Sequence, residues 1–275
     1  ARAIGLAQRL DRRLPAPKAA DEISRLVATF NEMLDRLEAA FVAQQRFVAD
    51  ASHELRTPLT TIQGNVDFLR REPAMATSDR LEALGDVADE AARMARLVSG
   101  LLALARADAG RHLDRTTVEL RPIIESCFHQ AQALARPTNL SIQLVVNRLE
   151  PGARVLADPD RLSELLMILL ENAMKYNRPN GLVRLVAATE GRSHRVIVSD
   201  TGRGIAPDHL PHIFERFYRS PDSRSEDGTG LGLAIARWIS NEHNARIAVE
   251  SVPDVGSTFT VTLPALQPAP LIAVS

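Results

Sequence analysis

Apolar residues at helical spacing dominate the first 108 residues, and this pattern limits the possible folds more than any other feature of the chain. Between residues 34 and 69 they recur at steps of three, four or seven, so they share one stripe of a helix for about five heptads. The stripe consists of Leu34, Leu37, Phe41, Val48, Leu55, Leu59, Ile62, Val66 and Leu69.

A polar break separates this stripe from a second one. Residues 70–73 interrupt the pattern, Ser78 and Asp79 can cap a new helix, and the helical spacing resumes from Leu84 to Ala105. Two long helices joined by a short polar turn form an antiparallel hairpin. Because such a hairpin cannot bury both stripes alone, we expect it to dimerise into a four-helix bundle.

The two ends of the chain have different sequence patterns. Residues 21–23 begin a helix, whereas residues 10–20, with two prolines, suit a connector. After Gly110 short strands and helices alternate, which predicts an α/β sandwich with helices on one side of a mixed sheet. We expect strands at 118–120, 140–146, 182–189, 194–200, 245–251 and 257–263, and helices at 122–136, 158–176 and 230–243. The fold class is thus multidomain, α plus α/β, with units at 1–40, 41–110 and 111–264 and a loosely held tail at 265–275.

Composition excludes several classes of protein. The chain has 33 basic and 34 acidic residues and a net charge of −1, so nothing favours nucleic acid as a partner. Its one cysteine, Cys127, excludes an intramolecular disulfide. It has neither an apolar run of about 20 residues nor a signal peptide, and we expect a soluble piece of a longer protein, since it begins at Ala1.

One histidine lies in an unusual helical context. His53 falls at the position farthest from the first stripe, Glu54 follows it, and Thr57 shares its exposed face one turn later. A lone histidine is more often an ordinary surface or core residue. However, Pro58 lies inside the helical pattern, where it removes a backbone hydrogen bond, and a helix keeps such a residue only for a reason.

Four separate segments of the second half suit phosphate and base chemistry. In Glu171-Asn172-Ala173-Met174-Lys175-Tyr176, an amide oxygen suitable for Mg²⁺ lies beside a cation. In Asp200-Thr201-Gly202-Arg203-Gly204-Ile205, a predicted strand ends at Asp200, whose carboxylate can accept a hydrogen bond. The two glycines that follow leave the backbone accessible to a flat ring. Phe214-Glu215-Arg216-Phe217-Tyr218-Arg219 lies in a long connection typical of a lid. Gly228-Thr229-Gly230-Leu231-Gly232-Leu233 leads into a helix start that suits an anion, without the Walker A pattern. Each segment alone also fits an ordinary turn or helix edge.

Taken in order, these segments resemble one family. The run from Phe47 to Thr60 is similar to the phosphoacceptor box of sensor histidine kinases of two-component systems, and the four later segments are similar to their N, G1, F and G2 boxes, with 256–259 as the closing glycine segment. Residues 21–40 look like the second helix of a HAMP relay module. The resemblance implies a HisKA-type dimerisation hairpin and an ATP-binding sandwich of the Bergerat type, as in DNA gyrase.

The resemblance also implies roles for single residues. His53 would accept the γ-phosphoryl group of ATP, Glu54 would act as general base, and Thr57 would orient a water for dephosphorylation of the partner regulator. Asn172 would bind Mg²⁺ and Asp200 would read adenine. The remaining ATP-binding residues would be Lys175, Tyr176, Gly202, Gly204, Ile205, Arg219, Gly228, Thr229, Gly230, Leu231, Gly232 and Leu233.

One position departs from the family. Ile168 stands four residues before Asn172, where the family commonly has Asn and gyrase-type ATPases have a hydrolytic Glu. Without an acid there, transfer to His53 is a better reading than ATP hydrolysis. Two alternatives stay open: a non-catalytic, ATP-binding dimeric relay, and a protein whose main activity is regulator phosphatase.

The implied partners are a second copy of the chain, ATP with Mg²⁺, and the receiver domain of a response regulator. The implied location is the cytoplasmic face of the bacterial inner membrane, with the membrane reached only through a segment upstream of Ala1. Among the other histidines only His209 and His212 have helical spacing, and we favour a surface position over a metal site for both.

Overall fold

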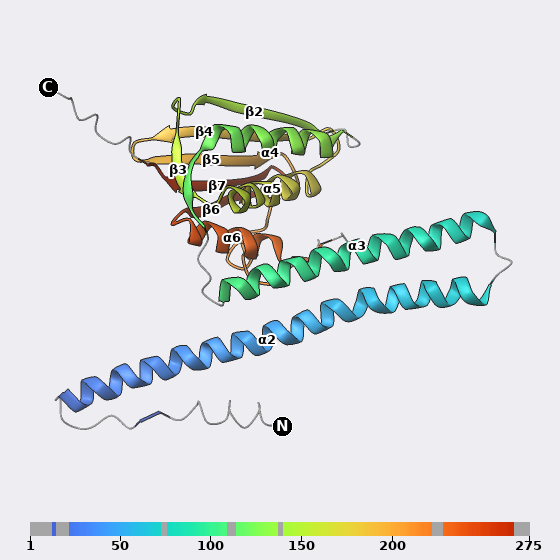
Figure 1. The fold of residues 1–275 in the computed structure, drawn as a ribbon, viewed down its shortest axis with the longest axis horizontal. Helices are drawn as coiled ribbons and strands as arrows, with labels where there is room; N and C mark the ends of the chain where they lie inside the picture. Colours follow the sequence, from blue (N-terminus) through green and yellow to red (C-terminus); the bar gives the residue numbers. More distant parts are fainter. Residues whose placement is uncertain are drawn as a thin grey trace. The chain divides into compact units, whose positions relative to one another are not determined.

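The computed structural model describes residues 13–14, 22–72, 76–108, 114–136, 140–221 and 228–266 (Figure 1). The chain divides into two compact units, residues 1–94 and 95–275, and each is described by itself. None of the described helices combines the length and the apolar character needed to cross a membrane.

Two long helices make up the described part of the first unit. Helix α2 spans Glu22–Arg71, and helix α3 spans Thr77–Asp108, with its second half in the second unit. Basic residues in the last turn of α2 and Asp79 in the first turn of α3 complement the helix dipoles. The predicted pair of helices and the break after Arg71 are confirmed.

Pro58 lies inside α2, as predicted, and its side chain is buried. Much of the apolar stripe along α2 is exposed within one chain: Val48 is 57% exposed and Leu59 is 46% exposed. Because apolar burial stabilises a fold by about 25 cal/mol per Å², a helix that leaves this surface in water gains little from it. Part of the stripe, including Val48 and Leu59, is therefore left uncovered in the described chain.

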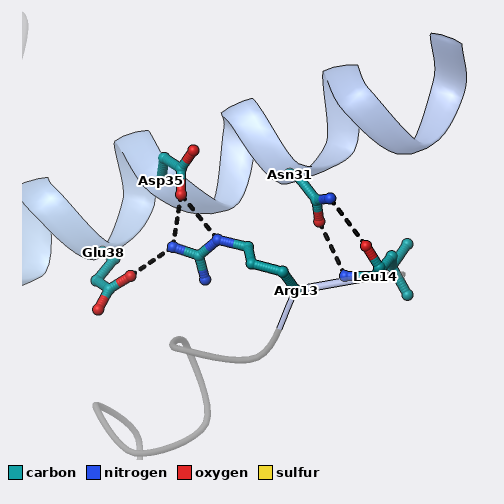
Figure 2. A network of polar contacts seen from close by, with 5 residues as sticks. All are labelled: Arg13, Leu14, Asn31, Asp35 and Glu38. Carbon is teal, nitrogen blue, oxygen red and sulfur yellow. Dashed lines mark hydrogen bonds and ion pairs between the residues drawn. The ribbon is translucent and has the colours of Figure 1, made fainter. Parts of the chain in front are cut away.

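The connector before α2 is described only at Arg13 and Leu14 (Figure 2). The amide of Asn31 accepts a hydrogen bond from the Leu14 N–H at 2.9 Å and donates one to the Leu14 carbonyl at 3.0 Å. The Arg13 guanidinium lies 2.6 Å from the carboxylate of Asp35 and 2.5 Å from that of Glu38. These contacts attach the connector to the stretch of α2 between Asn31 and Glu38.

The second unit contains a five-stranded mixed sheet. Its strand order is β2-β4-β5-β7-β6, with β2 and β4 parallel and all other neighbours antiparallel. The five strands are β2 (Ser141–Arg148), β4 (Leu182–Glu190), β5 (Ser193–Asp200), β6 (Arg246–Val252) and β7 (Gly256–Pro264). A separate two-stranded sheet pairs β1 (Thr116–Glu119) with β3 (Arg154–Ala157).

Three helices pack on one face of the large sheet: α4 (Leu120–Ala135), α5 (Pro159–Lys175) and α6 (Gly232–Glu242) (Figure 1). In β4, Val183, Leu185 and Ala187 are fully buried, whereas Arg184 between them is exposed. This alternation is typical of a sheet with one covered face. The predicted α/β sandwich is confirmed, and Cys127 is fully buried in α4, as predicted.

Strand β3 was not expected from the sequence. It has only four residues, and Arg154 and Leu156 point outward, so its apolar pattern is too short to distinguish from a loop. It forms because all four residues pair with β1, a non-local contact that local sequence does not reveal.

The start of α5 follows the prediction. The Asp158 carboxylate accepts hydrogen bonds from the N–H groups of Asp160 and Arg161, both at 3.1 Å, and Pro159 occupies the first turn. Buried His243 ties this cap to α6, because its Nε2 accepts the Asp158 N–H at 3.0 Å while its Nδ1 donates to the Ile239 carbonyl at 2.7 Å. The start of α5 and the end of α6 are thus fixed to each other.

Candidate functional site

A cavity of about 890 Å³ lies in the second unit. It is lined by residues at the ends of β5 and α5, in the turn between β6 and β7, and at the start of α6. This volume is within the range of small-molecule sites. Most of the predicted residues line it. They are Asn172, Lys175, Tyr176, Asp200, Gly204, Ile205, Arg219, Gly228, Thr229, Gly230, Gly232 and Leu233. Leu231 is buried beneath the wall, and Gly202 is covered by neighbouring backbone.

Asp200 is the most strongly held acceptor of the cavity. Its Oδ1 accepts the backbone N–H of Gly202 at 2.8 Å and that of Ser257 at 3.2 Å. Burial raises the pKa of Asp200, and these two N–H groups oppose the rise by stabilising the carboxylate. In the described chain Oδ2 has no hydrogen-bond partner, so it can accept a donor from a ligand.

Two glycines allow the backbone to close around Asp200. A Cβ on Gly202 would lie 2.2 Å from the Tyr176 carbonyl oxygen. A Cβ on Gly256, whose φ is +138°, would lie 2.0 Å from the Asp200 carbonyl oxygen. Any side chain at either position would push apart the elements that hold Asp200.

Another part of the wall carries positive charge around an aromatic ring. Lys175 Nζ lies 5.0 Å from the centroid of the Tyr176 ring, and Arg203 Cζ lies 4.6 Å from it. Both distances are within the range of cation–π interactions. A Cβ on Gly228 would meet Lys175 Nζ at 2.6 Å, so the glycine loop before α6 passes directly over this cation.

Helix α6 begins at Gly232, two residues later than predicted. Gly230 has a φ of +68°, which excludes it from a right-handed helix and places it in the loop. The loop and the free N–H groups of the first helical turn form a surface with positive character. An anion such as a phosphate suits that surface.

Sequence reasoning missed about half of the lining residues. These are Arg96, Ile168, Glu171, Arg203, Ala206, His209, Ile213, Tyr218, Ser220, Pro253, Asp254, Ser257 and Phe259. Arg203 and Tyr218 lie inside motifs that had been noticed, so their positions were available signals. His209 Nδ1 lies 2.8 Å from the Tyr218 hydroxyl, a contact that the i, i+3 spacing of His209 and His212 did not reveal. Pro253 and Asp254 carry no motif, and only the sheet brings them to the cavity.

The predicted phosphoacceptor residues lie in the first unit. His53 and Thr57 are exposed on α2, and no hydrogen bond to the His53 ring occurs among the described residues. The Glu54 carboxylate instead lies 3.6 Å from the Arg93 guanidinium of α3. His53 is thus exposed, as predicted, whereas the side chain of Glu54 points toward α3.

The donor set of the cavity fits one divalent metal ion. Asn172 and Glu171 bring hard oxygen donors to the wall, and no group of three His, Cys, Asp or Glu residues in the described ranges could form a metal cage. Mg²⁺ usually takes one or two protein ligands together with water and substrate phosphates. The residues present are therefore compatible with Mg²⁺ bound together with a phosphate ligand.

Comparison with known proteins matches three family models to the chain. Residues 1–39 match the HAMP domain, residues 43–110 match the His Kinase A (phospho-acceptor) domain, and residues 157–267 match the histidine kinase-, DNA gyrase B- and HSP90-like ATPase. The chain is 35% identical over 243 residues to the sensor histidine kinase YkoH of Bacillus subtilis, covering 88% of this chain and 52% of YkoH. It spans about half the length of the curated relatives that it matches.

Two solved structures share the fold. Full-length ShkA in complex with AMPPNP is 27% identical, with a TM-score of 0.60, and the match covers 82% of this chain and 46% of ShkA. Histidine kinase ThkA in complex with the response regulator protein TrrA is 22% identical, with a TM-score of 0.66, and the match covers 90% of this chain and 68% of ThkA.

Proposed function

This chain belongs to the two-component sensor histidine kinases, and from that membership we propose that it transfers the γ-phosphoryl group of ATP to His53 and then to an aspartate of a response regulator. The observation that carries the proposal is the cavity of the second unit. It combines a held carboxylate with one open oxygen, a cationic wall and a glycine loop at a helix start.

ATP fits this combination of groups. Asp200 Oδ2 accepts a hydrogen bond from the adenine amino group, and Lys175 together with the loop 228–230 receives the phosphates. Arg219 lines the cavity and adds a second cation for them. The AMPPNP bound by ShkA, whose matched region shares 27% identity with this chain, supports the choice of an adenine nucleotide.

Magnesium is the second component of the proposed site. Asn172 provides the amide oxygen that would hold the ion, with Glu171 beside it on the same wall. A bound Mg²⁺ supplies positive charge that stabilises the transferring phosphoryl group and the leaving ADP.

The acceptor chemistry suits an exposed imidazole. A neutral ring near pH 7 has a lone pair on one nitrogen. That nitrogen forms a bond to the γ-phosphorus while the bond between this phosphorus and the β–γ bridging oxygen breaks, and ADP leaves. The proton on the other ring nitrogen passes to the Glu54 carboxylate. Thr57, one turn from His53, orients a water for the later dephosphorylation of the regulator.

The exposed stripe of α2 supports a homodimer. Two hairpins that join their stripes form a four-helix bundle and remove this apolar surface from water. We assign residues 1–40 to a partial HAMP relay, 41–110 to the dimerisation and phosphoacceptor hairpin, 111–264 to the ATP-binding domain and 265–275 to a tail. We place these domains on the cytoplasmic side of the bacterial inner membrane, where ATP and response regulators are available.

Incubation of the whole chain with γ-labelled ATP and Mg²⁺ tests the proposal. We expect an acid-labile, alkali-stable label that disappears in His53→Gln. The matched control is His129→Gln, which changes an exposed histidine of α4 and should keep the full label. If the wild-type chain binds ATP and dimerises but takes up no label, it is a non-catalytic relay and the proposal is wrong. If Thr57→Ala raises regulator phosphorylation, the chain also acts as a phosphatase.

A further inference from the structure

An arginine from the second hairpin helix contacts the acidic neighbour of the phosphoacceptor. Arg93 Nη2 of α3 lies 3.6 Å from Glu54 Oε2 of α2, and Arg93 Nη1 donates a hydrogen bond to Glu90 Oε1 at 2.9 Å. The side chains of Arg93, Glu54 and Glu90 are only 19%, 32% and 21% exposed. This is a half-buried cluster that joins the two helices.

The contacts of Arg93 with Glu90 and Glu54 differ in kind. Its contact with Glu90 is a short hydrogen bond within one helix, at i, i+3 spacing, which fixes the guanidinium on α3. Its contact with Glu54 is longer than a hydrogen bond and crosses between the helices, so it depends on how α2 and α3 are packed. Glu54 is thus held by an ion pair that a small shift of one helix can open.

Helix geometry separates the two possible partners of Glu54. Consecutive positions on a helix are about 100° apart, so the side chains of His53 and Glu54 leave α2 in different directions. In the described chain Glu54 is turned toward α3 and makes no hydrogen bond with the His53 ring. Its carboxylate must therefore turn from α3 toward the ring before it can accept the imidazole proton.

We propose that Arg93 is a positioning residue that holds the Glu54 carboxylate against α3, and that transfer to His53 requires this ion pair to open. The inference deepens the proposed function and rests on it, because it assumes that Glu54 is the base. It makes the packing of α2 on α3 a control on phosphorylation. Since α2 continues without a break from Glu22 to Arg71, a rotation imposed at its start reaches Glu54 directly.

The first test measures the rate of His53 labelling in Arg93→Gln. We expect kcat to rise about 2- to 5-fold, a factor typical of losing one partly exposed ion pair, while the KM for ATP stays unchanged because the nucleotide cavity is untouched. Arg71→Gln, an exposed arginine at the end of α2, is the matched control and should have the wild-type rate. A lower or unchanged rate in Arg93→Gln overturns the proposal.

A double-mutant cycle separates this role from a general effect on folding. If Arg93 acts through Glu54, Arg93→Gln has no further effect in a Glu54→Gln background. If the rate rises equally in both backgrounds, the proposal is wrong. Glu90→Gln should have the opposite effect on the labelling rate. It removes the carboxylate that competes with Glu54 for Arg93, so the ion pair between Arg93 and Glu54 should strengthen and the rate should fall. This prediction stays testable if Arg93→Gln does not fold.

A third measurement does not depend on kinase activity. At a fixed pH, His53 of Arg93→Gln should react more slowly with diethyl pyrocarbonate than His53 of the wild type, because the released Glu54 carboxylate can form a hydrogen bond with the ring. The difference should be smaller when Glu54→Gln is also present. If the wild-type chain takes up no label, the proposed function is wrong. An equal modification profile with and without Arg93 overturns the positioning role alone.

Discussion

The cavity of the second unit and the helical hairpin of the first unit differ in how much of their apolar surface is buried. The cavity is surrounded by a unit that buries its own core, with Leu165, Leu169 and Val183 at most 1% exposed. The hairpin leaves apolar residues in water and presents His53 to solvent. Under the proposed function this difference is expected, because ATP has to be held in an enclosed site, whereas His53 has to be reached first by ATP and then by the response regulator.

The two regions also differ in which groups carry the chemistry. In the cavity, backbone N–H groups fix Asp200, and glycines permit the close approach of the chain. On the hairpin, side chains alone decide the chemistry, and a single ion pair sets where Glu54 points. Substitutions should therefore act through shape in the second unit and through charge in the first.

Charges placed on the exposed stripe of α2 should give the largest effect. Leu59 and Val66 are 46% and 40% exposed in one chain, but a four-helix bundle would bury them. In Leu59→Glu/Val66→Glu the dimer should weaken by more than about 1,000-fold, since each buried unpaired charge costs several kcal/mol. Sedimentation equilibrium measures the change.

A charge-matched variant completes this test. Arg46→Glu changes the net charge by −2, as the double variant does, but lies at a position of α2 far from the stripe, where it is exposed. It should leave the dimer intact. ATP binding by the second unit should persist in both variants, and a dimer that survives in the double variant would disprove the bundle.

Loss of the Asp200 charge should have the next largest effect, confined to the cavity. Asp200→Asn keeps the shape of the side chain but offers an amide in place of the carboxylate, so the Kd for ATP should rise about 10- to 100-fold, the value of one hydrogen bond to a charged group. Isothermal titration calorimetry measures it. Asp208→Asn, an exposed residue of the same connection, is the control. An unchanged Kd would show that Asp200 does not contact the ligand.

The aromatic wall should contribute less. Replacing Tyr176 with Leu removes the ring that lies between Lys175 and Arg203 and should weaken ATP binding about 3- to 10-fold. Tyr176→Phe keeps the ring and should bind like the wild type. If the Phe variant is as weak as the Leu variant, the hydroxyl rather than the ring is what matters.

The sequence revealed those parts of the molecule that local rules determine. The cap at Asp158, the buried stripe of α5 and the exposed position of His53 all follow from spacing and residue type within one segment. Strand β3 and the late start of α6 do not. The first depends on pairing with distant β1, and the second depends on the positive φ of Gly230.

The candidate site shows the same limit. Asp200 and its glycines could be found from a motif, but the hydrogen bond from the Ser257 N–H to Asp200 could not, although Ser257 lies in the closing glycine segment. It reaches Asp200 because β5 and β7 are neighbours, with Ser199 opposite Thr258. The ion pair between Glu54 and Arg93 was missed for a similar reason, since their separation along the chain hides the register of α2 on α3.

The smallest expected effect is a pH dependence of the stability of the second unit that the first unit does not share. His194, 2% exposed, lies in the second unit with its Nδ1 3.0 Å from the Thr189 hydroxyl. That hydroxyl oxygen also accepts the Glu150 N–H at 3.1 Å, so the buried ring takes part in a local polar network. Burial lowers the pKa of His194 from its ordinary value of 6.5, although the backbone of Arg154 and the charge of Glu150 oppose the shift.

Because the folded state then binds fewer protons than the unfolded state, stability should rise with pH below 6.5 and level off above it. Trp238, the single tryptophan of the chain, lies in α6 and reports the second unit alone. Urea unfolding followed by its fluorescence should show a lower midpoint at pH 5.5 than at pH 7.5. In His194→Leu this difference should shrink, whereas His129→Gln should keep it. Because the hairpin does not contain this histidine, its dimer should dissociate at the same concentration in the wild type and in His194→Leu at both pH values, and a matching change there would show that the two units unfold as one.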